Sequence, residues 1–396
     1  MTANQIIKVA IIFINYGPYH LARARALKQI PGLDPSFIQL AGSIESHPWR
    51  VDGEASSLEL RTLSQIPYEK CGYPHLARSL QKALDEINPA VVVTAAYRPF
   101  IMLRAARWAR SHGNHAVLFF ETTRWDRFRH PIAEKLKRWM IASYYDAAFV
   151  GGRAHREYLL ELRMPESQIW QPYDVVDNER FAELAASVRA DAECWRKRLG
   201  LPQHYFLYVG RYCAEKNLPR LLQAYRLYRA KFPAGWSMVL VGDGPQRTEL
   251  ERLASNAGPC RILVRPFEQV ETLAAYYALA ECFVLPSMVD PWGLVVNEAM
   301  ACGLPVLVSR LCGCGYDLVT DGGNGFLFDP HDIDALADLL GRMSSLDDAA
   351  RQAMSVQSQE IIAAFTPAIW AEQLAQCIKT ITREKHDRAN LQTALQ

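Results

Sequence analysis

The sequence of 396 residues has no long hydrophobic run and no excess of charge of one sign. Its apolar runs, such as 9–14 and 273–280, fall far short of the ~20 residues that a membrane-spanning helix needs. The chain also opens without the charged, apolar and small-residue regions of a signal peptide. Because 44 basic residues stand against 42 acidic ones, the overall charge gives no attraction to nucleic acid. We therefore expect a protein that is neither exported nor membrane-spanning and has no nucleic-acid partner.

Cysteine is scarce and irregularly spaced, with nine residues in all. The only close pair, Cys312 and Cys314, leaves one residue between the thiols, whereas zinc knuckles leave two or more. We expect reduced thiols in a cytoplasmic protein. The triplet 332–334 has the Asp-x-Asp pattern of a metal site, but it follows Pro330 at a predicted helix start, where acidic residues act as caps. The sequence therefore predicts no metal.

What the chain does contain is an alternation of short β-branched or aromatic runs with helical periodicity, which is typical of parallel sheets wound with helices. The first half has candidate strands at 8–14, 36–41, 90–97, 115–121 and 147–151. The second half has them at 206–211, 237–243, 261–267, 281–287, 305–310 and 325–328. The pattern predicts an α/β chain with two doubly wound domains of similar size.

The domain boundary is predicted within the polar stretch 178–200. Residues 173–178 are typical of an extended exit from the first sheet, and 191–199 of a new helix. We place an N-terminal Rossmann-like domain at 1–180 and a C-terminal one at 195–365. Since doubly wound sheets bind ligands at the carboxyl ends of their strands, motifs that directly follow strands carry the functional signal.

The segment richest in such signals is 286–305, which reads PSMVDPWGLVVNEAMACGLP after a predicted buried strand. Its turn precedes a helix start, and the unpaired N–H groups of a helix N-terminus attract phosphate. The predicted phosphate cradle comprises Trp292, Gly293, Leu294 and Val295. Asp290 and Glu298 lie roughly 12 Å apart along a helix, comparable with the hexose-to-ribose distance of a sugar nucleotide. An ordinary strand-turn-helix with two solvated acids explains the same residues equally well.

The order of these residues resembles the retaining glycosyltransferases of family 4, the glycosyl transferases group 1. In that family two Rossmann-like domains face each other across a cleft, the GT-B architecture. Its signature of two glutamates separated by seven residues corresponds to Asp290 and Glu298, so this chain carries Asp at the first position. Further matches in the expected order lie at 209–211, 215–217, 241–245 and 321–326. The resemblance implies transfer of a hexose from a nucleoside-diphosphate sugar, UDP favoured over GDP, to an acceptor hydroxyl of unknown type, with no metal.

Residue roles follow from the same resemblance. Arg211 and Lys216 match the Arg and Lys that contact the donor diphosphate, Asp290 would face the transferred sugar, and Glu298 would accept hydrogen bonds from the ribose. The charge argument is independent of the family: two cations directly after a strand, beside a helix N-terminus, neutralise phosphate charge that grows as the nucleoside diphosphate leaves. We therefore predict Arg211, Lys216 and Asp290 as catalytic residues.

Glycine-bearing loops complete the predicted donor site. Gly17 follows the first strand, where the family has a loop that approaches the donor, and Gly210 and Gly244 lie in matched motifs. The turn at 242–245 is equally explained as a plain strand-to-helix connection. It lacks the third glycine and the acidic partner of a dinucleotide fingerprint, so NAD is not expected. The nucleotide base would be held by backbone groups of 265–270.

The first domain matches the family more weakly. Where many members have a functional histidine after the strand at 115–121, this chain has Glu121. Its place at a strand end fits a group that orients or deprotonates an acceptor hydroxyl, so we include it among the catalytic candidates. A purely structural or acceptor-binding carboxylate is an equal alternative. His20 is interpreted as a surface or helix-start residue.

A basic, aromatic stretch lies at 124–139. Six basic residues face two acids there, with Trp125, Phe128 and Trp139 between them. The stretch fits peripheral contact with the inner face of a membrane, or an anionic acceptor. A solvated helix with a few anchoring aromatics is the alternative.

In the GT-B fold the terminal helix crosses back to the first domain, and we expect this of 367–382. Trp370, Leu374 and Ile378 form an apolar stripe there at a spacing of four. Two other functions remain open. One is an epimerase or glycan phosphorylase of the same fold, and the other is a non-catalytic subunit that binds a sugar nucleotide, suggested by Asp290 in place of Glu.

Overall fold

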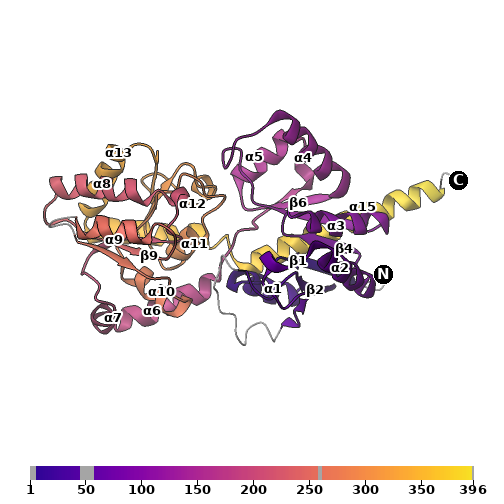
Figure 1. The fold of residues 1–396 in the computed structure, drawn as a ribbon, viewed down its shortest axis with the longest axis horizontal. Helices are drawn as coiled ribbons and strands as arrows, with labels where there is room; N and C mark the ends of the chain where they lie inside the picture. Colours follow the sequence, from indigo (N-terminus) through magenta and orange to yellow (C-terminus); the bar gives the residue numbers. More distant parts are fainter. Residues whose placement is uncertain (1–5, 45–57, 257–260, 395–396) are drawn as a thin grey trace. The chain divides into compact units, whose positions relative to one another are not determined.

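The computed structural model describes residues 6–44, 58–256 and 261–394 (Figure 1). Contacts within the chain divide it into two compact units. Unit 1 comprises Met1–Arg124, Phe128–Val175 and Pro367–Gln396, and unit 2 comprises Trp125–Arg127 and Val176–Thr366. Each unit is built on a parallel sheet with helices on both faces (Figure 1). This confirms the predicted α/β class with two doubly wound sheets.

The sheet of unit 1 has the strand order β3-β2-β1-β4-β5-β6-β7, and all its pairs are parallel. Its strands are β1 (Ile7–Phe13), β2 (Leu33–Gln39), β3 (Arg61–Thr62), β4 (Val91–Thr94), β5 (His115–Phe120), β6 (Ala147–Val150) and β7 (Ile169–Trp170). Its helices are α1 (Pro18–Lys28), α2 (Tyr73–Ile87), α3 (Phe100–Ser111), α4 (Pro131–Tyr144), α5 (Arg153–Glu161) and α15 (Pro367–Ala394). The order reverses between β1 and β4, which is the topological switch point of a doubly wound sheet.

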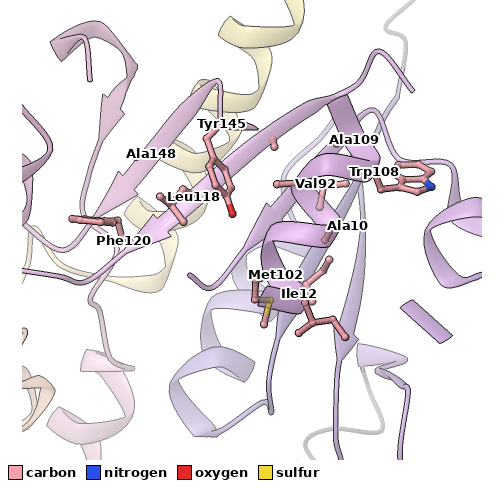
Figure 2. Packing of buried hydrophobic residues seen from close by; sticks show 14 of the residues in the cluster. Ala10, Ile12, Val92, Met102, Trp108, Ala109, Leu118, Phe120, Tyr145 and Ala148 are labelled. Carbon is pink, nitrogen blue, oxygen red and sulfur yellow. The ribbon is translucent and has the colours of Figure 1, made fainter. Parts of the chain in front are cut away.

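Apolar side chains on both faces of this sheet form the core of unit 1. Strands buried on both faces are apolar at nearly every position, because no face is left to water. On one face Val92 packs in the same cluster as Met102 of α3 (Figure 2). On the other face Phe119 and Phe149 contact Trp370 of α15, with ring centroids 5.9 and 6.2 Å apart. The central strands are therefore held from both sides.

The C-terminal helix α15 supplies the second of these covers. Trp370, Leu374 and Ile378 are at most 1% exposed, and the helix packs against α1 of the same unit. By length and hydropathy alone, the stretch Asp348–Arg383 would be long enough to cross a membrane. It is two helices separated by a turn at 363–366, and its apolar stripe lies in the core of unit 1. We therefore interpret α15 as a core helix.

The sheet of unit 2 has the parallel order β10-β9-β8-β11-β12-β13. Its strands are β8 (Tyr205–Val209), β9 (Ser237–Val241), β10 (Ile262–Arg265), β11 (Cys282–Leu285), β12 (Val306–Ser309) and β13 (Gly325–Phe328). Its helices are α6 (Asn178–Ala190), α7 (Ala192–Leu199), α8 (Leu218–Lys231), α9 (Arg247–Ser255), α10 (Val270–Leu279), α11 (Leu294–Ala301), α12 (Gly315–Leu318), α13 (Ile333–Ser344) and α14 (Asp348–Ile362). The switch point lies between β8 and β11, so the loops after these two strands meet at one edge of the sheet.

The passage between the units lies at Val175–Val176, just ahead of the predicted stretch 178–200. The reason is that residues after 177 form helix α6 and pack on α10 and α11 of unit 2. Asp177 caps this helix by accepting a hydrogen bond from the backbone N–H of Arg180 at 3.2 Å. The polar stretch therefore consists of two helices: α7 corresponds to the helix predicted at 191–199, and α6 was not predicted.

Candidate active site

The loops after β8 and β11 are bonded to each other at the switch point of unit 2. The loop after β8 ends in a single 3-10 turn, Ala214–Lys216. Its Glu215 carbonyl accepts the backbone N–H groups of Met288 and Val289, which follow β11, at 2.7 and 3.3 Å. Two segments more than 70 residues apart in sequence are thereby fixed side by side, and each carries a predicted catalytic residue.

These two residues, Lys216 and Asp290, form a buried ion pair. The Lys216 Nζ lies 2.5 Å from Asp290 Oδ2, and the two side chains are 14% and 9% exposed. Ser287 Oγ donates a hydrogen bond to the same carboxylate oxygen at 3.4 Å. Burial lowers the pKa of Lys216, but the charge of Asp290 and its hydrogen bond outweigh burial, so the pKa stands above its usual value. The ammonium group therefore keeps its proton throughout the physiological pH range.

The backbone of Asp290 is fixed as well. Its carbonyl accepts the N–H of Gly313 at 3.0 Å, and the residue forms an isolated parallel bridge with Cys312 after β12. Burial and the neighbouring Asp290 carboxylate raise the pKa of the Cys312 thiol, which stays neutral beside the pair. The carboxylate predicted to face the transferred sugar thus lies against Lys216 in this structure.

The N-terminus of α11 lies next to this pair. Gly293 is its N-cap at φ +100°, and a Cβ built there would lie 3.6 Å from Asp290 Oδ2. The first-turn residues Leu294 and Val295 are half-buried, and their N–H groups have no partner within the helix. The predicted phosphate cradle is therefore adjacent to the ammonium group of Lys216.

The side chain of Trp292 is buried, so the part predicted for this residue in the cradle falls to its backbone alone. Its side chain is 3% exposed, its Nε1–H donates to Asn297 Oδ1 at 2.9 Å, and its ring packs on Phe365. Asn297 was not among the predicted site residues. The signal for it was an amide beside Glu298 in a helix whose other six residues are apolar, since a polar group buried in α11 needs a partner.

Glu298 is almost completely enclosed. Its residue is 1% exposed, and Oε2 accepts a hydrogen bond from the hydroxyl of Tyr277 on α10 at 2.6 Å. A donor ribose would have to share this carboxylate with Tyr277, a partner that the sequence analysis missed. The ribose-binding role of Glu298 remains a prediction.

Arg211 lies at the exposed end of the loop after β8. The loop is fixed because the hydroxyl of Tyr208 donates to the Arg211 carbonyl at 2.9 Å, while the guanidinium side chain extends into solvent. Gly210 precedes it at φ +148°, and a Cβ there would lie 2.8 Å from the Tyr208 hydroxyl. The tight turn at Gly210 therefore positions Arg211.

Steric crowding explains why the loop after β9 has glycine at positions 242 and 244. A Cβ on Gly242, at φ +155°, would lie 1.9 Å from the Gly210 carbonyl oxygen, and one on Gly244 would lie 2.6 Å from the Tyr212 carbonyl. The loops after β8 and β9 touch at these points. This close backbone approach accounts for both glycines, and a donor contact by Gly244 remains a prediction.

Gly17 and Glu121 belong to unit 1. Gly17 caps α1, and its N–H donates to His20 Nδ1 at 3.0 Å, which confirms His20 as a helix-start residue. Glu121 is exposed at the carboxyl end of β5. Burial raises the pKa of Tyr173, and the Glu121 charge raises it further. The structure thus leaves Glu121 at the carboxyl edge of its sheet, where it was predicted.

The part of the chain described by the structure contains no group of three or more His, Cys, Asp or Glu side chains that could hold a metal ion. The triplet 332–334 is a helix cap, because Asp332 Oδ1 accepts the N–H of Ala335 at 2.9 Å at the start of α13. Its Asp-x-Asp pattern is thereby explained by local structure.

Two doubly wound sheets, the second with a cationic loop and a helix N-terminus at its switch point, define an α/β protein whose class binds ligands at that edge of the sheet. Residues 191–360 match the family model of the glycosyl transferases group 1. The match covers 170 of the 396 residues and lies within unit 2, so the protein is a glycosyltransferase, and its fold is the GT-B fold. The assignment to family 4 is consistent with this match.

Individual relatives agree with this identification. The chain is 26% identical to alpha-D-kanosaminyltransferase of Streptomyces kanamyceticus over 71% of its length and 73% of that protein. It is 35% identical to D-inositol 3-phosphate glycosyltransferase of Xylanimonas cellulosilytica over 44% of its length, and spans 42% of that relative. The solved structure of Anabaena HepE in complex with UDP and glucose superposes with a TM-score of 0.73 at 16% identity, covering 94% of this chain and 100% of that one.

Proposed function

We propose that the protein transfers a hexose from a nucleoside-diphosphate sugar to an acceptor hydroxyl with retention of the anomeric configuration. The observation that carries the proposal is the buried Lys216–Asp290 pair beside the N-terminus of α11, at the switch point of the β8–β11 sheet. An ammonium group and unpaired helix N–H groups together complement a diphosphate.

The chemical role of these groups follows from where charge develops. As the bond from the sugar C1 to the phosphate oxygen breaks, the electron pair goes to the leaving diphosphate, whose negative charge increases. Lys216, Arg211 and the N–H groups at the start of α11 stabilise that charge. The acceptor hydroxyl then forms the new bond on the same face of the sugar, and the leaving phosphate takes its proton. Glu121 is the group of unit 1 that would orient the hydroxyl or accept this proton instead.

UDP is the proposed nucleotide, ahead of GDP. Support comes from the solved HepE structure, whose ligands are UDP and glucose, although at 16% identity the likeness itself extends only to the fold. No divalent metal is part of the proposal, because Lys216, Arg211 and the helix terminus supply positive charge to the diphosphate. We propose a cytoplasmic location, where nucleotide sugars are substrates, and leave the acceptor as a hydroxyl compound of unassigned type.

The transfer reaction is tested by incubating the protein with UDP-hexoses and a panel of hydroxyl acceptors in the presence of EDTA. We expect UDP release that depends on the acceptor and a product whose C1 coupling in proton NMR matches that of the donor. Conversion of the UDP-sugar without any acceptor would instead identify an epimerase of the same fold. Inversion at C1 would contradict the proposed same-face attack.

A further inference from the structure

Helix α4 of unit 1 presents an exposed apolar ridge. The ridge consists of Phe128, Ile132, Leu136 and Trp139, which are 89%, 71%, 52% and 56% exposed. Ile132, Leu136 and Trp139, at spacings of four and three residues, align along one side of the helix, and Phe128 lies in the loop just before it. Large apolar side chains exposed singly need no explanation, but three in one line, with a fourth in the preceding loop, form a patch that is typical of an interaction surface.

The opposite side of α4 packs against the rest of unit 1. Met140 and Ile141 are buried there, and Lys137 pairs with Glu134 at 2.8 Å. Glu134 also accepts a hydrogen bond from the Tyr158 hydroxyl at 2.5 Å. Burial raises the pKa of Glu134, but its hydrogen bonds to Lys137 and Tyr158 lower the pKa by more. The carboxylate is therefore ionised, and the ammonium group of Lys137 balances its charge. The helix is thus anchored without the ridge.

The charges beside the ridge are positive. Lys135 and Arg138 are exposed: Lys135 lies beside the ridge, three residues after Ile132 and four before Trp139, and Arg138 follows Lys135 by three residues on the same flank. The acid of this helix, Glu134, lies on the inner side with Lys137. Apolar residues flanked by exposed cations, with aromatic rings near both ends of the line, are the pattern of a helix that lies flat in a membrane interface.

The same character continues from α4 onto α3. The ring of Tyr144 lies edge-on to Trp139 at 6.0 Å, and the Arg107 guanidinium lies 5.9 Å from the same Tyr144 ring. Arg107 also lines a hollow of about 690 Å³ between α2 and α3, together with Arg104 and the exposed Phe100. Basic and aromatic residues therefore extend beyond one helix, onto α3.

We propose that the ridge of α4 and its flanking cations dock unit 1 on an anionic lipid surface. The proposal commits to a bilayer because cations lie beside the apolar line, which complements acidic headgroups above an apolar interior. The proposed surface is smaller than the stretch 124–139 predicted from the sequence, because it leaves out Trp125. This residue belongs to unit 2, where its Nε1–H donates to the Leu311 carbonyl at 3.0 Å. The proposal does not depend on the transfer reaction.

The test is sedimentation of the full chain with vesicles of phosphatidylcholine, with or without about one third phosphatidylglycerol. We expect binding to the anionic vesicles that falls as salt is raised. The Ile132→Ser/Trp139→Ser variant should bind roughly tenfold or more weakly, because it removes two large apolar side chains from the interface. The Lys135→Glu/Arg138→Glu variant should lose its preference for the anionic vesicles.

Matched controls come from unit 2, where Leu227 is 41% exposed and Lys197 is exposed. Leu227→Ser and Lys197→Glu should leave vesicle binding unchanged. Wild-type chain that stays in solution with anionic vesicles would overturn the proposal. So would equal losses in the control and α4 variants, or a wild-type dimer that the α4 variants convert to monomer, since the ridge would then be a protein interface. These experiments measure only vesicle binding and oligomeric state, so a negative result would not bear on the proposed transfer reaction.

Discussion

Replacing Lys216 with alanine should lower kcat by about 10²–10³-fold, the usual effect of removing one preorganised charge-stabilising group. The ammonium lies at the switch point beside the N-terminus of α11, where the leaving diphosphate would lie. Its raised pKa keeps it charged during turnover. The loss should appear in kcat, because the contact strengthens as phosphate charge grows in the transition state.

The measurement is UDP release under saturating donor and acceptor. Lys231→Ala is the matched control, since Lys231 pairs with Asp338 at 2.6 Å on the exposed surface of the same unit and is 55% exposed. Its kcat should equal that of the wild type. A Lys216→Ala variant with wild-type kcat and an intact fold would remove this residue from the mechanism.

Replacing Asp290 with alanine should lower the free energy of unfolding by about 3–5 kcal/mol. The substitution leaves the Lys216 ammonium 14% exposed without its carboxylate, and breaking a buried pair costs far more than breaking an exposed one. Asp338→Ala, which breaks the exposed pair with Lys231, should cost at most about 1 kcal/mol. Denaturant unfolding curves of the two variants provide the comparison.

A double variant separates stability from catalysis at this pair. Asp290→Leu combined with Lys216→Met replaces both charges by apolar side chains and should recover most of the lost stability. It should not recover activity, because the cation beside α11 is gone. If Asp290→Ala proves as stable as Asp338→Ala, the pair is not the buried, coupled unit that the structure shows.

The sequence was sufficient for the fold because the central strands of both sheets, such as β4, β8 and β11, are fully buried and almost entirely apolar. Some predicted strands extend past the true strand end, because the turn residue that follows the strand does not change the polarity of the sequence. The strand predicted at 206–211 stops at Val209, because Gly210 turns at φ +148°. Helix α6 was missed because its charged face dominates the composition, although Phe181, Ala185 and Val188 form a buried stripe at helical spacing.

For the site, the sequence predicted which loops matter but not how their side chains pair. Lys216 and Asp290 both follow strands, yet their contact depends on β8 and β11 being neighbours in the sheet. The direction of a side chain is also set by tertiary packing: Trp292 turns inward to Asn297. A contact between side chains far apart in the sequence cannot be predicted from either motif alone, because it depends on which strands are neighbours in the sheet.

The central claim is that unit 2 binds a nucleoside diphosphate at the Lys216 loop and the start of α11. The most direct test is the melting temperature of the purified protein with UDP, GDP, ADP and dTDP, each with and without magnesium. We expect one diphosphate, UDP first, to raise the melting temperature without metal. At a 100-fold excess over Kd the stabilisation is about 2.7 kcal/mol, and it should be lost in Lys216→Ala. No shift with any of the four, or a shift that Lys216→Ala retains in full, would contradict the claim.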